Sequence, residues 1–133
     1  MKRRLGILIG SLLGITVFCQ SPNIIWQKSF GGIGTEHARK IIQTTDAGYI
    51  IAGETQSNDG DVTGNHGKSD IWVVKINAAG TILWQKTYGG TNGDDAFGIQ
   101  QTTDGGYVIA GSTESNDGDV TGNHGGWDLW LIK

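Results

Sequence analysis

Residues 57–67 have the sequence Ser-Asn-Asp-Gly-Asp-Val-Thr-Gly-Asn-His-Gly, and the same letters return without a change at residues 115–125. The identity extends on both sides of this segment. Residues 24–75 align without a gap with residues 82–133, at an offset of 58 positions, and 32 of the 52 pairs are identical. A fixed period of this length indicates a repeat architecture in which each unit packs against its neighbours. We therefore expect two units, residues 24–81 and residues 82–133.

Within each unit, apolar and polar residues alternate with a period of two, which is typical of β-strands. Short segments that begin with Asp or Asn and end with Gly, at residues 46–48, 77–80 and 104–106, indicate tight turns between the alternating segments. The segments predicted to form strands are residues 24–30, 38–44, 49–55, 70–77 and 82–88. No window shows helical periodicity. The sequence predicts an all-β fold of two tandem four-stranded antiparallel repeats.

Four short antiparallel strands per repeated unit fit one blade, the four-stranded sheet from which a β-propeller is built. The period exceeds that of a usual blade and leaves room for a long loop at residues 56–69. A β-solenoid and a small sandwich of two sheets are the alternative architectures. Two blades form only a partial β-propeller, because a ring needs about four to eight. The missing blades would come from copies of the chain or from missing repeats of a longer propeller.

The composition excludes two classes of protein. The 133 residues include 13 acidic and 10 basic side chains, for a net charge of −3. A nucleic-acid-binding protein normally carries a basic face, so no nucleic-acid partner is expected. The single cysteine excludes a disulfide scaffold within the chain. Gly is abundant, with 23 residues against one Pro, as expected for many turns between short strands.

The first 19 residues have the organisation of a signal peptide. Three basic residues, Lys2, Arg3 and Arg4, precede an apolar run at residues 5–18, and Cys19 provides a small side chain before the expected cut. The apolar run is too short to span a bilayer comfortably, so no transmembrane span is predicted. Export to the extracellular space or the cell surface is the expected location. A lipidated Cys19 is the alternative.

The long loop of each unit carries oxygen side chains at loop positions 1, 3, 5 and 12, with Gly at position 6. This spacing can wrap a chain around Ca²⁺. The predicted ligands are Asp59, Asp61, Thr63 and Asp70 in the first loop, and Asp117, Asp119, Thr121 and Asp128 in the second. Strands flank these loops, so the site would not be an EF-hand. The alternative is purely structural, because Asn and Asp side chains form turns by binding the local backbone.

Other side chains carry weaker signals. Trp127 has no counterpart in the first unit, where Ser69 stands, and could form an exposed aromatic platform for a sugar ring. The alternative is a lone surface aromatic residue. The loop histidines, His66 and His124, are expected to make hydrogen bonds, since zinc would need more ligands at one point. Asp94 and Asp95 are expected to be solvated turn residues.

Four segments together carry a resemblance to a known group of proteins. They are Trp-Gln-Lys-x-x-Gly-Gly at residues 84–90, Thr-Thr-Asp-Gly-Gly-Tyr-Val-Ile-Ala-Gly at 102–111, the invariant loop at 115–125 and Asp-Leu-Trp-Leu-Ile-Lys at 128–133. The pattern resembles a tandem repeat of secreted and surface proteins of Bacteroidota. The resemblance implies a propeller-like fold, and longer members often end in a sorting domain for type IX secretion. It implies no catalytic residues.

The function expected from these observations is that of a secreted or cell-surface repeat module, structural or adhesive, with Ca²⁺ as the stabilising ion predicted for its loops. It would not be an enzyme, because near-identical loops indicate equivalent sites rather than one asymmetric catalytic constellation. The alternative is a carbohydrate-binding lectin whose ring is completed by oligomerisation. A piece of an enzyme propeller is a third and weaker hypothesis.

Overall fold

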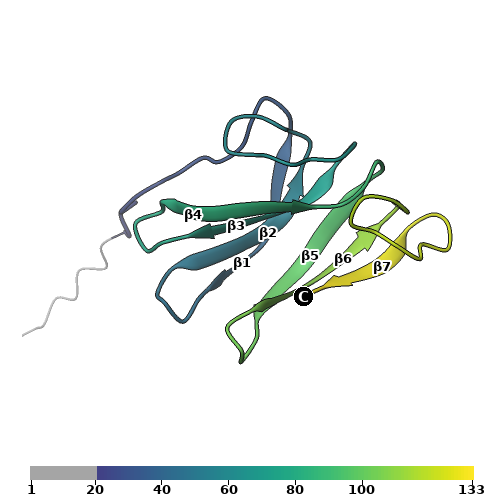
Figure 1. Cartoon of the computed structure of the whole chain (residues 1–133). Helices are drawn as coiled ribbons and strands as arrows, with labels where there is room; N and C mark the ends of the chain where they lie inside the picture. Colours follow the sequence, from purple (N-terminus) through teal and green to yellow (C-terminus); the bar gives the residue numbers. More distant parts are fainter. Residues whose placement is uncertain (1–20) are drawn as a thin grey trace, which may run out of the picture.

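The computed structural model describes residues 21–133 as seven β-strands joined by turns and loops (Figure 1). The strands form two antiparallel sheets, ordered β1-β2-β3-β4 and β5-β6-β7. Their bounds are β1 (Glu36–Gln43), β2 (Tyr49–Thr55), β3 (Asp70–Ile76), β4 (Ile82–Tyr88), β5 (Asp94–Gln101), β6 (Tyr107–Thr113) and β7 (Asp128–Ile132). The prediction of an all-β fold is confirmed.

The N-terminal segment predicted to be a signal peptide, residues 1–19, lies outside the described residues. From residue 21 onward the chain contains no helix, and hence none with the length and apolarity needed to cross a membrane.

Short polar turns connect the neighbouring strands of each sheet. Between β3 and β4, the side chain of Asn77 accepts hydrogen bonds from the backbone N–H groups of Ala79 and Thr81, at 3.0 and 2.9 Å. Gly80 completes this turn at φ 76°, a conformation that glycine adopts without steric cost. Between β1 and β2, Asp46 accepts from the N–H of Gly48 at 3.1 Å. These are the local side-chain-to-backbone bonds that favour Asn and Asp in turns.

The predicted strand at residues 24–30 is not formed. Its counterpart in the second repeat, β4, pairs with β3 and completes the first sheet. The first sheet therefore takes its last strand from the second repeat, and the sheet boundary falls one strand later than the repeat boundary. A strand needs an edge to pair with, and within residues 21–133 no strand pairs with residues 24–30.

The second sheet consequently has three strands in the described chain instead of the four predicted, and neither sheet closes on itself. The predicted number of four strands is thus found in the first sheet, but one of these strands, β4, comes from the second predicted repeat.

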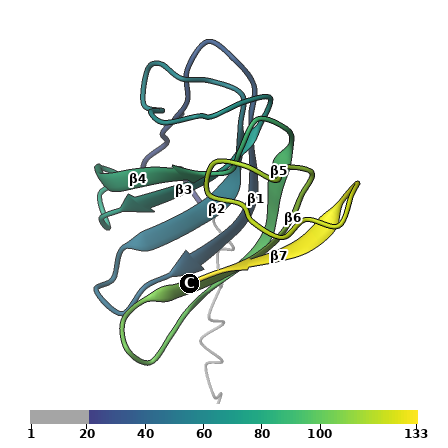
Figure 2. The same ribbon diagram turned by 45° about the vertical axis from the view of Figure 1, so that its right-hand side comes forward.

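The main core lies between the two sheets, where β5 runs next to β1 and β2 (Figure 2). Side chains from both sheets interdigitate here, and burial of each large aliphatic side chain contributes about 1.5–3 kcal/mol. The buried members are Ile50, Ala52, Ile71, Val73, Ala96, Ile99 and Ile109.

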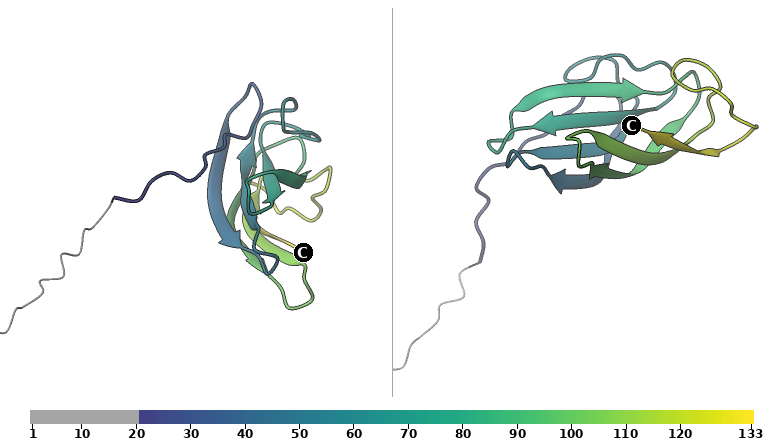
Figure 3. Two further views of the ribbon diagram at one scale, coloured as in Figure 1. Left: turned by 90° about the vertical axis from the view of Figure 1, so that its left-hand side faces the viewer. Right: turned by 60° about the horizontal axis from the view of Figure 1, so that its bottom comes forward.

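A second apolar cluster covers the opposite face of the first sheet. Val62, from the long loop, is fully buried there against Trp72, Val74 and Ile76. Phe30 packs against the same cluster from the segment before β1. The left view of Figure 3 shows that this segment approaches the first sheet from the side away from the second sheet.

Candidate functional site

The long loops, at residues 56–69 and 114–127, both lie at one end of the strands, with the hairpin turns at the other end (Figure 1). Each loop is held against the segment that precedes the first strand of its sheet, residues 31–35 in one case and 89–93 in the other. Since the two loops share the same letters, their contacts can be compared position by position.

In the first loop, the predicted calcium ligands accept hydrogen bonds from other groups of the chain. Asp59 accepts a hydrogen bond from the N–H of Ile33 at 2.9 Å, and Asp61 accepts from the N–H of Gly31 at 3.2 Å. The hydroxyl of Thr63 accepts from the side-chain amide of Gln85, on β4, at 2.5 Å.

Asp70, the fourth predicted ligand, stands at the start of β3. One carboxylate oxygen, Oδ2, accepts from the backbone N–H of His66 at 3.0 Å and lies 2.6 Å from the Nδ1 of the same histidine. This contact agrees with the hydrogen-bonding role expected for His66.

The second loop repeats these contacts. Asp117 accepts from the N–H of Thr91 at 2.8 Å, and Asp119 accepts from the N–H of Gly89 at 3.3 Å. Asp128 accepts from the N–H of His124 at 2.7 Å, and its Oδ2 lies 3.0 Å from the Nδ1 of that histidine. Thr121 is exposed, as Thr63 is, but it lines a small cavity instead of binding a glutamine of a neighbouring strand.

These acidic side chains therefore act as hydrogen-bond acceptors that tie each loop to its sheet. In the part of the chain that the structure covers, no three side chains of His, Cys, Asp or Glu are grouped so that they could hold a metal ion. As arranged, the predicted ligands do not form a cage, and Ca²⁺ binding stays a prediction.

A carboxylate on the first strand of each sheet lies at the centre of each network. Asp94 is fully buried in β5, and Asp95 is half-buried, so the expectation of solvated turn residues is wrong. Asp94 accepts hydrogen bonds from the hydroxyls of Thr113 and Ser115 and from the N–H of Gly90.

Glu36 has the corresponding place in the first sheet and accepts from Thr55, Ser57 and Gly32. Burial acts to raise its pKa, but the hydrogen bonds from Ser57 and Thr55 outweigh it and lower the pKa. The sequence held a signal for this network, because both repeats carry an acidic residue, a Thr and a Ser at corresponding positions. These residues are Glu36, Thr55 and Ser57 in the first repeat and Asp94, Thr113 and Ser115 in the second.

Asp70 is a buried carboxylate with one unsatisfied oxygen. It is 0 % exposed, and its Oδ1 accepts no hydrogen bond from the described residues. Gly89 separates it from Asp94: a Cβ at Gly89 would stand 2.6 Å from Asp94 Oδ2 and 2.7 Å from Asp70 Oδ1. Burial raises the pKa of Asp70, although hydrogen bonds from His66 oppose the shift.

Asp128, the counterpart of Asp70, behaves in the opposite way. The hydrogen bonds from His124 lower its pKa, because its burial is weaker. The aspartate at this position of the motif therefore has a raised pKa in the first repeat and a lowered pKa in the second, because only the first is buried.

Trp127, the predicted sugar platform, is half exposed in the second loop. Its ring lies against Gly93, since a Cβ at Gly93 would stand 3.0 Å from the indole edge. Ser69, at the same position in the first repeat, forms an isolated parallel bridge with Gly93. Trp127 thus stands, in the second repeat, at the position where Ser69 of the first repeat contacts Gly93 of the second.

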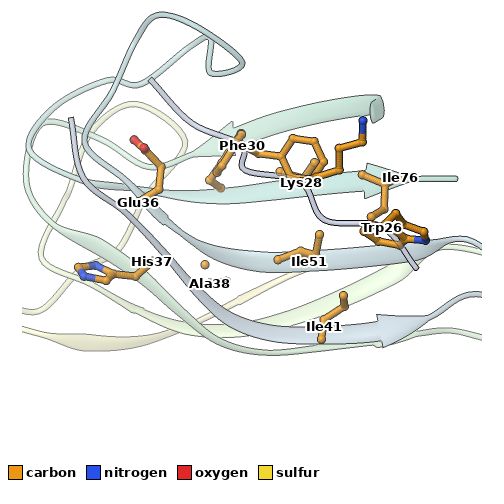
Figure 4. A pocket seen from close by; sticks show the side chains of 12 residues that line it. Trp26, Lys28, Phe30, Glu36, His37, Ala38, Ile41, Ile51 and Ile76 are labelled. Carbon is orange, nitrogen blue, oxygen red and sulfur yellow. The ribbon is translucent and has the colours of Figure 1, made fainter. Parts of the chain in front are cut away.

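An apolar cavity of about 380 Å³ lies between residues 24–30 and the outer face of the first sheet. Figure 4 shows Lys28 and Phe30 on one side of it, Ile41 and Ile51 on the other, and Trp26 beside Ile76.

A second cavity, of about 270 Å³, lies beside β7. Its lining includes Thr121, Asp128 and Trp130. Neither cavity was predicted, because each depends on the offset between the repeat boundary and the sheet boundary.

No protein-family model and no curated protein gives a significant match to this chain.

Proposed function

We propose that this protein is a non-enzymatic secreted or cell-surface module of β-propeller-like repeats, with a structural or adhesive role. The observation that carries the proposal is the equivalence of the two loop networks. Asp59 and Asp117 make the same contact with the backbone, as do Asp61 and Asp119. A catalytic site needs different groups in different roles around one point, whereas duplicated networks stabilise duplicated loops.

The packing of the sheets supports the propeller-like part of the proposal. Each sheet is antiparallel with neighbouring strands in chain order, as in a blade, and the second sheet packs on one face of the first. The other face of the first sheet is also apolar. A sheet that presents apolar residues on both faces suits a radial array in which every blade has two neighbours.

The test of the secreted role is fractionation of a bacterial host that expresses the complete chain. We expect the protein in the medium or on the outer surface, shortened at its N-terminus near Cys19. A variant with Leu12→Arg and Leu13→Arg, which interrupts the apolar run at residues 5–18, is the matched control and should remain inside the cell. Full-length wild-type protein in the cytoplasm would contradict the proposal.

The adhesive role is tested by binding of the purified chain to arrays of immobilised matrix proteins and polysaccharides. Saturable retention on at least one surface would support adhesion. Absence of retention from every surface would contradict adhesion and leave the structural role.

A carbohydrate-binding lectin is the second candidate, and the half-exposed ring of Trp127 favours it. Aromatic side chains with one free face are suited to stacking on sugar rings. On a glycan array, Trp127→Ala should abolish binding while Trp127→Phe retains part of it. Identical binding by wild type and Trp127→Ala would contradict this role for Trp127.

The calcium prediction is tested by thermal unfolding in millimolar CaCl₂ and in EDTA. Extracellular modules bind Ca²⁺ with Kd values of roughly 10⁻⁴–10⁻³ M, so 5–10 times that concentration, on the order of 10 mM, suffices. A rise in Tm with CaCl₂ that is reversed by EDTA would support the prediction. Equal Tm values in both solutions would contradict it.

A further inference from the structure

We propose that copies of this chain associate head to tail, with residues 24–30 of one copy forming a fourth strand beside β7 of the next copy. The inference rests on the propeller-like arrangement proposed above, but not on an adhesive role.

The donated segment has the sequence of a strand that the structure already contains. Residues 24–30 are Ile-Ile-Trp-Gln-Lys-Ser-Phe, and β4 is Ile-Leu-Trp-Gln-Lys-Thr-Tyr. β4 pairs along its length with β3. Since β7 is the counterpart of β3, an equivalent strand beside β7 has to come from a segment like residues 24–30.

The segment is also already placed as such a strand would be. Trp84 of β4 contacts Tyr107 of the second sheet, with ring centroids 6.1 Å apart and an angle of 56°. Trp26 contacts Tyr49 of the first sheet at 6.4 Å and 63°.

The last residues of the two segments, Tyr88 and Phe30, also pack in equivalent ways. Tyr88 packs into the core with Trp130 and Ile132, and Phe30 packs with Trp72 and Val74. Residues 24–30 thus lie on the first sheet as β4 lies on the second, so donation requires no displacement of the segment from its own sheet.

The accepting edge has an open space where β4 stands in the first repeat. There, the indole N–H of Trp72 donates to the side-chain oxygen of Gln85 at 2.8 Å, and the amide of Gln85 donates to Thr63. Their counterparts, Trp130 and Thr121, instead line the cavity of about 270 Å³ beside β7.

Gln27 is the counterpart of Gln85 and supplies the missing partner. Its side-chain oxygen would accept from Trp130 and its amide would donate to Thr121, as Gln85 does in the first repeat. An unpaired strand edge is also a template for addition of another strand.

The sheet faces complement one another in the same arrangement. Leu129 and Leu131 are 78 % and 63 % exposed on the outer face of β7, whereas their counterparts, Ile71 and Val73, are buried against the second sheet. Docking of the next copy would place Leu129 and Leu131 over the outer face of its first sheet, which carries the cavity of about 380 Å³. The junction between copies would then reproduce the junction within a copy.

Such a contact joins two different surfaces, so it repeats from copy to copy, and it forms a ring when the rotation between copies closes. Two copies would supply four sheets and three copies six, both within the usual range of propellers.

The register follows from the pairing of β3 with β4, in which Val73 lies opposite Lys86. By the repeat offset, Leu131 of one copy lies opposite Lys28 of the next. Both side chains are exposed, so cysteines at these positions should be tolerated.

The experiment mixes two variants of the complete chain, both carrying Cys19→Ser, one with Lys28→Cys and the other with Leu131→Cys. We expect mild oxidation to produce mixed disulfide dimers in at least tenfold excess over a control in which Thr103→Cys, in an exposed turn, replaces Leu131→Cys. Adding Gln27→Ala to the Lys28→Cys variant should lower the yield several-fold without changing the unfolding midpoint of the dilute chain.

Mixed dimers that form equally well with Thr103→Cys, or that do not form at all, would overturn the inference. The latter result also covers the case in which another segment already occupies the edge of β7. Because the readout is a covalent link at a defined register, it is separate from the fractionation and array measurements, and each proposal can fail without the other.

Discussion

Lys75 and Lys133 occupy the same position in the two repeats, and each binds the aspartate of a hairpin turn. Lys75 contacts Asp46 at 2.9 Å with only 5 % of its side chain exposed, and Lys133 contacts Asp104 at 2.5 Å with 59 % exposed. Removing the partner of a buried charge is far more costly than removing that of an exposed one.

We therefore expect Asp46→Ala to destabilise the chain several times more than Asp104→Ala. Urea unfolding of the two variants, side by side with wild type, measures the difference. The hydroxyls of Thr44 and Thr102 make equivalent bonds to the two aspartates, so the comparison isolates the lysines. Equal losses in the two variants would contradict the argument.

The stability of the fold should depend on pH through Asp70 and Asp128, whose pKa values are shifted in opposite directions. Burial raises the pKa of Asp70, with the nearby Asp94 adding to the shift, so the folded protein holds this proton to a higher pH than the unfolded chain. Stability from this group is present in acid and is lost as the pH rises from about 3.8 through the raised folded pKa. For Asp128 the pKa is lowered, and its contribution is lost as the pH falls below about 3.8.

Asp70→Asn should therefore raise the urea midpoint at pH 7, and the gain should shrink towards pH 4. An amide at this position can still accept from the N–H of His66 and removes the charge that lies near Asp94. Asp128→Asn, the matched control, should give no gain at pH 7. A midpoint for Asp70→Asn below that of wild type at pH 7 would contradict the assignment.

At the scale of the element, β3 and β7 show how one sequence pattern can have two environments. β3 is Asp-Ile-Trp-Val-Val-Lys-Ile and is buried at every position, whereas β7 is Asp-Leu-Trp-Leu-Ile and alternates between half-buried and exposed. The difference comes from the neighbours, since β3 lies between β2 and β4 and β7 pairs only with β6 among the described strands.

Ile71→Ala in β3 should cost about 2–5 kcal/mol of unfolding free energy, the range for large-to-small substitutions in a core. Leu129→Ala, at the same position of β7, should cost less than about 0.5 kcal/mol in dilute solution, as is usual for a surface substitution. Chemical denaturation at low protein concentration measures both. A large loss for Leu129→Ala under these conditions would show that the outer face of β7 is covered.

At the scale of the whole molecule, the proposed association through the outer faces of both sheets would make stability depend on protein concentration. Association that buries Leu131 stabilises the folded state by mass action, by up to about 1.4 kcal/mol for each tenfold increase in protein concentration. We expect the urea midpoint of wild type to rise over a hundredfold range of concentration.

The variant Leu131→Glu should remove this dependence and leave the midpoint of the dilute chain unchanged, because Leu131 is exposed there. Thr103→Glu, in an exposed turn, is the control and should retain it. Analytical ultracentrifugation of the same samples gives the sizes of the species. A midpoint for wild type that does not change with concentration would contradict the expectation.

Much of the fold was predictable because it depends on short-range chemistry. The strands at residues 49–55 and 82–88 were predicted with their observed bounds, since alternation and flanking turns are local. The prediction failed at residues 24–30 and at Asp94. The first forms a strand only beside an accepting edge, and the second lies in a network made by groups from three different segments.

The amino-acid order alone thus specifies strands, turns and a duplicated unit of 58 residues, because propensities and turn bonds act over a few neighbours. Only the assembled chain reveals that β4 belongs with β3, that Asp70 is covered while Asp128 is not, and that the loop carboxylates bind backbone amides. Burial and strand pairing depend on which surfaces meet in space, and in this protein near-identical sequences meet different surfaces.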